Sequence, residues 1–162
     1  MWRSTVKAAV TGTCEAMFGG EFGAFRSRDR HVFDEDAPVC RELFKVLALR
    51  AESLPLHRGR QFLRQISGDG DNFGLPRMLG GRLPSTVLWS RVFSDREVLL
   101  AINTDPDTAR TAWVTIDHDL HAEGDVLSCL YSSDPAQIGV ESRNGCAGRL
   151  TVPPGGFVVW RE

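Results

Sequence analysis

The sequence predicts an α+β chain in which a helical N-terminal region, residues 1–58, precedes an all-β antiparallel sandwich, residues 59–162. Two observations support this division. Apolar residues before position 54 recur at helical spacing, whereas later residues form short segments rich in β-branched and aromatic side chains, separated by turn residues. The change falls at the stretch 54–59, Leu-Pro-Leu-His-Arg-Gly, where proline and glycine interrupt both patterns.

The clearest helix is predicted from Asp36 to about Leu54. Asp36 is a favourable N-cap, and Pro38 suits the first turn, where a missing N–H has no cost. Pro55 disfavours helical backbone at the residue before it, so the helix is expected to end there. One apolar stripe is predicted on this helix, made of Val39, Leu43, Val46 and Leu47 and widened by Cys40 and Phe44.

Seven short strands are predicted after this helix. The stretch 94–97, Ser-Asp-Arg-Glu, is a good hairpin turn, and Pro-Pro-Gly-Gly at 153–156 separates the last two strands. This many short strands in about 100 residues is typical of a β-sandwich or barrel. The predicted strands are Gln61–Ser67, Thr86–Phe93, Val98–Asn103, Thr111–Ile116, Val126–Tyr131, Arg149–Val152 and Phe157–Trp160.

The composition argues against several classes of partner. The chain is 42% hydrophobic and 25% charged, with a formal net charge of −2, near the averages of soluble globular proteins. Because the charges are scattered and form no basic patch, neither a nucleic-acid partner nor a membrane partner is expected. No apolar run approaches the roughly 20 residues that span a bilayer, and the N-terminus lacks a convincing signal peptide. A cytoplasmic location is favoured, although the compartment stays open.

No cofactor and no metal ion are predicted. The four cysteines match no zinc or haem spacing, and Cys40 and Cys129 are interpreted as buried thiols. The stretch 69–72, Asp-Gly-Asp-Asn, suggests calcium but lacks the EF-hand ligands at the fifth and twelfth positions. His118 and His121 lie between two predicted strands rather than on a helix face, which disfavours a metal site.

Five segments, taken in order, resemble the C-terminal part of the alpha-amylase family of glycoside hydrolases. Phe-Gly-Gly-Glu at 18–21, followed by an aromatic and glycine-rich loop, resembles the end of that family's eighth barrel strand. The stretches 41–50 and 54–60 resemble its last barrel helix and the exit from that helix. The apolar run 98–103, which ends in asparagine, and Pro-Pro-Gly-Gly-Phe-Val-Val at 153–159 resemble strands of its C-terminal domain.

The resemblance implies that residues 1–58 are the end of a (β/α)₈ barrel and that the parent enzyme acts on α-glucans or related α-glucosides. Retaining glycoside hydrolysis needs two carboxyl groups about 5–5.5 Å apart. The family places its catalytic acids after barrel strands four, five and seven, so no catalytic residue is predicted in this chain. The loop after strand eight would face the active-site mouth, which makes Glu21, Phe22 and Arg26 the candidate substrate-binding residues.

Three hypotheses for the function stay open. In the first, the chain is a non-catalytic C-terminal portion whose partner is the catalytic barrel of the parent enzyme. In the second, it is a free-standing carbohydrate-binding β-module that holds an α-linked oligosaccharide through Trp89, Trp113 and the loop 18–25. The placement of both tryptophans in alternating strands favours core positions instead. In the third, the chain is a subunit that completes a barrel. Self-association through the apolar helix stripe is also expected.

Overall fold

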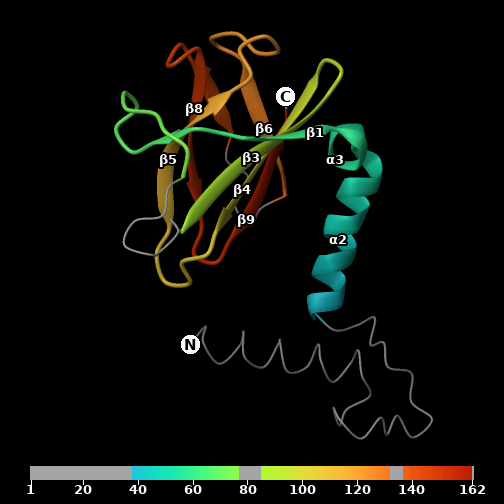
Figure 1. Cartoon of the computed structure of the whole chain (residues 1–162). Coiled ribbons are helices and arrows are strands. Elements are labelled where there is room, and N and C mark those ends of the chain that lie inside the picture. The colour runs from blue at the N-terminus through green and yellow to red at the C-terminus, as the bar shows by residue number, and fades with distance from the viewer. Residues whose placement is uncertain (1–37, 77–84, 132–136, 162) are drawn as a thin grey trace, which may run out of the picture. The chain divides into compact units, whose positions relative to one another are not determined.

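The computed structural model describes residues 38–76, 85–131 and 137–161. The chain divides into two units, residues 1–49 and 50–162, and the described residues of the first unit all belong to α2. Antiparallel β structure dominates the second unit (Figure 1). The described elements are α2 (Pro38–Glu52), α3 (Leu54–Arg58), β1 (Arg60–Leu63), β2 (Ile66–Ser67), β3 (Thr86–Phe93), β4 (Arg96–Asn103), β5 (Arg110–Ile116), β6 (Val126–Tyr131), β7 (Ile138–Glu141), β8 (Cys146–Val152) and β9 (Phe157–Arg161). The predictions for residues 1–37, including the Asp36 cap, lie outside the described residues.

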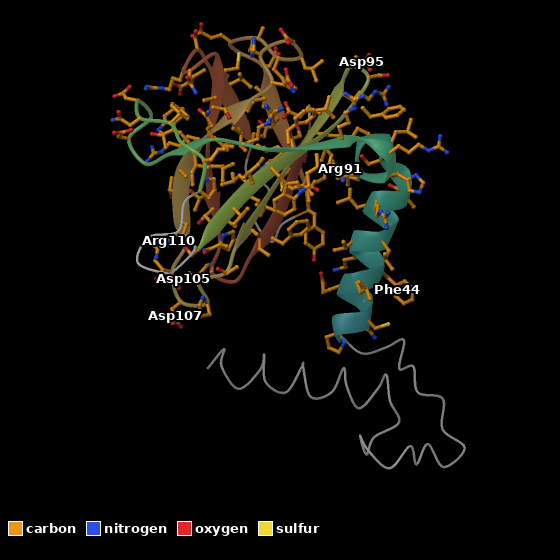
Figure 2. The ribbon with its side chains drawn as sticks, viewed as in Figure 1. Phe44, Arg91, Asp95, Asp105, Asp107 and Arg110 are labelled. Carbon is orange, nitrogen blue, oxygen red and sulfur yellow. The ribbon has the colours of Figure 1, made fainter. Side chains whose placement is uncertain are left out.

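Three of the predicted apolar side chains of α2 are about half exposed. Leu43 and Phe44 are each 52% exposed, and Leu47 is 47% exposed. Figure 2 shows Phe44 projecting from α2. Neither described helix is long and apolar enough to cross a membrane.

The end of α2 lies close to the predicted one, but Leu54, where Pro55 was expected to disfavour helical backbone, is itself helical. The helix stops at Glu52, and Ser53 is extended, with φ −108° and ψ 109°. A second helix, α3, then begins, which the sequence analysis did not predict. Pro55 lies in its first turn, where the absent N–H is not needed. Gly59 ends α3, since a side chain there would meet the carbonyl oxygens of Pro55 and Val92 at 2.5 and 2.9 Å.

The nine strands form one antiparallel sheet that folds over into two facing layers. The strand order is β1-β3-β4-β9-β6-β7-β8-β5-β2. One layer contains β1, β3, β4, β9 and β6, the other contains β7, β8, β5 and β2, and the β6–β7 pair joins them. The first and last strands in this order, β1 and β2, are separated in sequence only by Arg64 and Gln65. One extended segment therefore starts on the edge of the first layer and ends on the edge of the second.

The strand predictions hold for most of the sheet and fail in two places. The bounds of β3 and β6 agree with the predicted strands Thr86–Phe93 and Val126–Tyr131. The predicted strand Gln61–Ser67 is divided into β1 and β2 because the chain changes layers between them. The sequence pattern does not predict β7, because this four-residue strand contains Gly139 and is too short for its alternation to stand out.

The hydrophobic core lies between the two layers. Leu88, Leu99 and Trp160 come from the first layer, and Val114 and Leu150 come from the second. This arrangement corrects the expectation that Trp89 and Trp113 are core residues. Each lies beside a buried inward residue, so strand alternation directs both indoles to the outer faces, where they are half-buried.

Asn103, the last residue of β4, holds one end of the sandwich together. It is fully buried, and its amide nitrogen lies 2.8, 3.3 and 3.1 Å from the carbonyl oxygens of Thr108, Val152 and Pro153. Its amide oxygen accepts a hydrogen bond of 3.1 Å from the backbone N–H of Asp105. The side chain thus connects β4, the loop after it and the end of β8.

Replacement of Asn103 is expected to destabilise the fold more strongly with aspartate than with alanine. Asn103→Ala leaves buried carbonyl groups without a donor, which costs about 1–3 kcal/mol. Asn103→Asp places a carboxylate oxygen against the same carbonyl oxygens and should cost more. Urea unfolding of both variants measures the difference, with Asp107→Asn, an exposed substitution in the same loop, as the control. Equal stability of Asn103→Asp and the parent chain would contradict this role.

Candidate functional site

A cluster of polar and charged side chains lies where the chain passes from β1 to β2. Arg64 directly follows β1, and its guanidinium contacts three polar side chains. Its Nε donates to the Ser90 hydroxyl at 2.7 Å, while Nη2 lies 2.6 Å from Glu97 Oε1 and 3.2 Å from Asp117 Oδ2. Ser90 and Glu97 belong to the first layer, and Asp117 directly follows β5 of the second. One side chain therefore bridges both layers; we call these residues and His121 the corner cluster.

Glu97 is the most deeply buried carboxylate of the corner cluster, with a side chain that is 2% exposed. Burial alone would raise its pKa. The hydrogen bond with His121, the charge of Arg64 and the backbone N–H of Asp117 together outweigh burial and hold the pKa of Glu97 below its usual range. Its Oε2 accepts from the Asp117 N–H at 3.0 Å and lies 3.3 Å from His121 Nε2. Glu97 is therefore ionised, and both of its carboxylate oxygens have polar partners.

A cleft of about 470 Å³ adjoins the corner cluster on the side of α3 and the β3–β4 hairpin. Glu97 and His121, whose side chains are each 2% exposed, line its inner end. Arg96 and Arg161 belong to its lining, as does Asp95, which Figure 2 shows at the hairpin tip. The cleft therefore mixes both signs of charge, and its lining contains no phenylalanine, tryptophan or tyrosine.

The corner cluster does not suit acid–base or nucleophilic chemistry. A general acid for glycoside cleavage needs a raised pKa, whereas the pKa of Glu97 is lowered. Its second carboxylate, Asp117, is not available as a partner across a substrate, because the guanidinium of Arg64 occupies the space between the two. The arrangement instead matches a structural ion cluster that fixes how the layers meet.

The remaining candidates from the sequence are separated in the structure. His118 is exposed, whereas His121 is buried in the corner cluster. Asp69 uses its carboxylate within its own turn, and hydrogen bonds from the Asn72 backbone, Ser67 and the Asn72 side chain hold its pKa far below the usual range. Among the described residues, no group of three or more His, Cys, Asp and Glu side chains is placed to hold a metal ion.

The two outer-face tryptophans differ in how far they are covered. The guanidinium of Arg143 lies over the Trp113 ring, with 4.5 Å between Cζ and the ring centroid. The backbone at Gly70 also abuts this indole, because a side chain there would lie 2.9 Å from Nε1. Trp89 instead stacks with Phe157 at 6.4 Å between centroids and 29° between ring planes. Tyr131 packs against the same Phe157 ring at 5.7 Å.

The proposed substrate-binding residues, Glu21, Phe22 and Arg26, lie outside the described residues. No sequence motif identifies Arg64 or Glu97 as a site residue. One signal could have found them: each is a charged residue within or beside a predicted strand, and a charge there is costly unless it is paired. Their pairing across 33 positions of sequence is not visible without the fold.

Glu97→Gln is expected to destabilise the chain by about 3 kcal/mol at neutral pH, because it removes the nearer and more buried of the two carboxylates that neutralise Arg64. Since folding lowers the pKa of Glu97, its contribution to stability is present above the usual glutamate range and is lost as the pH falls below it. Chemical unfolding between pH 7 and pH 3 should therefore show the gap between the parent and the variant closing with acid.

Glu42→Gln provides the matched control, because Glu42 pairs with Lys45 at the surface at 2.7 Å. An exposed pair of this kind contributes about 0–1 kcal/mol. The structural role of Glu97 is contradicted if both substitutions change the free energy of unfolding equally.

Comparisons with known proteins agree with the family that the sequence resembles. No protein-family model and no curated protein matches the chain. The Nostoc punctiforme debranching enzyme is similar over 98% of this chain, with 16% identity and a TM-score of 0.60. The gamma-cyclodextrin glucanotransferase (CGTase) of alkalophilic Bacillus clarkii matches 95% of it, with 19% identity and a TM-score of 0.53. CldA, a cyclomaltodextrin glucanotransferase with a three-domain ABC distribution, matches 80%, with 18% identity and a TM-score of 0.51.

These matches show a shared fold. The chain covers 32%, 23% and 23% of the three proteins respectively, so it spans about a quarter to a third of their length. All three are alpha-amylase-family enzymes, and the described β region has the fold of a corresponding part of these larger chains.

Proposed function

We propose that this chain is the C-terminal portion of an alpha-amylase-family enzyme that processes α-glucans or related α-glucosides. Residues 1–58 would be the end of the catalytic (β/α)₈ barrel, and residues 59–162 the C-terminal β-sandwich. The observation that carries this proposal is the fold match over 95–98% of the chain to glucan-processing enzymes of which it covers a quarter to a third.

The exposed side of α2 supports a barrel origin for this helix. The last helix of a barrel buries apolar side chains against the strands and helices beside it. Leu43, Phe44 and Leu47 form such a surface on α2 and are about half exposed here. An apolar stripe of this kind fits a helix whose packing partners belong to the catalytic barrel of the parent enzyme.

The chemistry of the described region supports a non-catalytic role. Its deeply buried carboxylate, Glu97, is ionised and paired with Arg64. We assign no catalytic residue to this chain. Glu21, Phe22 and Arg26 are proposed to contact sugar, or to order neighbouring loops, only when the rest of the active site is present.

The purified chain should release no reducing sugar or cyclic product from soluble starch, pullulan or cyclodextrins. The reason is that a retaining glycosidase needs a nucleophile and an acid about 5–5.5 Å apart, and we place this pair in the parent barrel. Glu21→Gln serves as the companion variant. Turnover that co-purifies with the chain and disappears in Glu21→Gln would overturn the proposal.

The size of the natural polypeptide gives an independent readout. Antibodies raised against this chain should detect in the source cells a protein about three to four times its 17.9 kDa mass, given the 23–32% coverage of its neighbours. A band at 17.9 kDa that co-purifies with a separate amylase-like polypeptide would instead identify a subunit that completes a barrel.

A second candidate function, a carbohydrate-binding β-module, is favoured by one feature. Trp89, Phe157 and Tyr131 form a half-buried aromatic cluster on an outer face of the sheet. Aromatic faces of this kind suit contact with sugar rings. Trp113 is a poorer platform, because Arg143 covers its ring.

This alternative predicts saturable quenching of tryptophan fluorescence by maltooligosaccharides. Trp89→Ala should weaken the affinity at least about tenfold, a loss of about 1.4 kcal/mol. Trp113→Ala is the matched control and should bind as the parent chain does. A parent chain without any response to the oligosaccharide would eliminate the module and leave the C-terminal portion as the function.

A further inference from the structure

The outer edge of β1 has unpaired backbone groups. The Arg64 N–H donates to the Leu88 carbonyl at 3.0 Å, and this bond fixes which residues of the segment face β3. Because hydrogen-bonded and non-hydrogen-bonded pairs alternate along an antiparallel ladder, Phe62 faces β3, while Gln61 and Leu63 direct their N–H and C=O groups outward. Within the part of the chain that the structure describes, no backbone group pairs with this edge.

The other end of the sheet, at β2, is closed by the chain itself. Ile66 would present its backbone groups outward in the same way. Its N–H donates to the Gly74 carbonyl at 2.9 Å, and its carbonyl accepts from the Gly74 N–H at 3.0 Å. The loop after β2 therefore covers one edge of the folded sheet and leaves the other, at β1, accessible.

The side chains of β1 do little to protect its edge. All four residues are exposed, and Phe62 and Leu63 are 43% and 49% exposed. Natural edge strands avoid pairing through short length, charged side chains, proline, bulges or inward-pointing charges, and of these β1 has a length of four residues and one charge, Arg60. The strand contains no proline, and its register with β3 is regular. An accessible, regular and partly apolar edge is a template for another strand.

We propose that two copies of this chain associate by pairing β1 with β1 in antiparallel orientation, centred on Phe62. In this register Gln61 of each copy lies opposite Leu63 of the other. Both outward residues then exchange N–H···O=C bonds, which gives four backbone hydrogen bonds related by a two-fold axis. This register is self-complementary, and the inference does not depend on the proposed function.

The side chains are compatible with this register. Phe62 of one copy would face Phe62 of the other as a non-hydrogen-bonded pair, the closer kind of cross-strand neighbour. Arg60 of each copy would lie opposite Arg64 of the other. The guanidinium of Arg64 is turned into the corner cluster and is neutralised by Glu97 and Asp117, so the two arginines do not oppose pairing.

The interface is small, well below the roughly 1,600 Å² of a standard interface. Association should therefore be weak, with a dissociation constant on the order of 100 μM. Sedimentation velocity of the full chain from about 10 to 500 μM should show a monomer–dimer equilibrium.

Charge substitution at Phe62 tests the two-fold register directly. Phe62→Lys and Phe62→Glu each place like charges opposite each other, so each variant alone should stay monomeric over the whole range. An equimolar mixture should form a heterodimer, because lysine then faces glutamate. Only a register in which position 62 meets itself predicts this pattern.

A backbone substitution covers the case in which the charge variants fold poorly. Leu63→Pro removes an outward N–H without removing a β1–β3 bond, a position that edge strands tolerate. It should abolish the dimer while leaving the thermal melt near that of the parent. Leu75→Ser, at an exposed leucine outside β1, is the control and should dimerise normally.

Two results would overturn the proposal. The first is a parent chain that remains monomeric at 500 μM. The second is a dimer that persists in both Phe62→Lys and Leu63→Pro. If that dimer is lost in Phe44→Ser, the interface lies on the stripe of α2 instead.

Discussion

The ion cluster around Arg64 determines how the two layers of this fold meet. Arg64 occupies the short connection where one extended segment leaves the edge of the first layer and joins the edge of the second. Its guanidinium contacts Glu97 from one layer and Asp117 from the other. A buried guanidinium needs carboxylate partners in matched positions, so the point of crossing has little freedom. The positions of β1 and β2 follow from this requirement.

A second polar residue plays the corresponding part at a different point of the sandwich. Asn103 directs one amide towards carbonyl groups of the loop after β4 and the end of β8. Apolar packing between the layers is not directional and tolerates small shifts of one sheet over the other. The corner cluster and Asn103 supply the directional contacts that the core lacks. The hydrogen bonds of Asn103 also give a physical reason for the run 98–103 to end in asparagine.

Local patterns explain which parts of this fold could be predicted from the sequence. Strand alternation with flanking turns was enough for β3 and β6. Pro55 indicated a break near the end of α2, but the break lies at Ser53 and the residue before the proline, Leu54, is helical. The orientation of Trp89 was not predictable, because an alternating strand with apolar residues on both faces does not show which face is inside. The corner cluster depends on contacts between residues 33 and 53 positions apart, which no local pattern reveals. The candidate loop at residues 18–25 stays a prediction.

The distribution of exposed apolar side chains bears on where this chain meets other protein surfaces. Among the described residues, eight large apolar side chains are exposed, and six of them lie between positions 43 and 63. This segment comprises most of α2, all of α3 and β1, and it connects the helical region to the sheet. The rest of the β region buries its apolar residues efficiently and neutralises its buried charges. The apolar surface that the described residues leave exposed is therefore concentrated in the segment from α2 to β1. The proposed pairing of β1 with a second copy would use the exposed residues of this segment that lie on a sheet edge, Phe62 and Leu63.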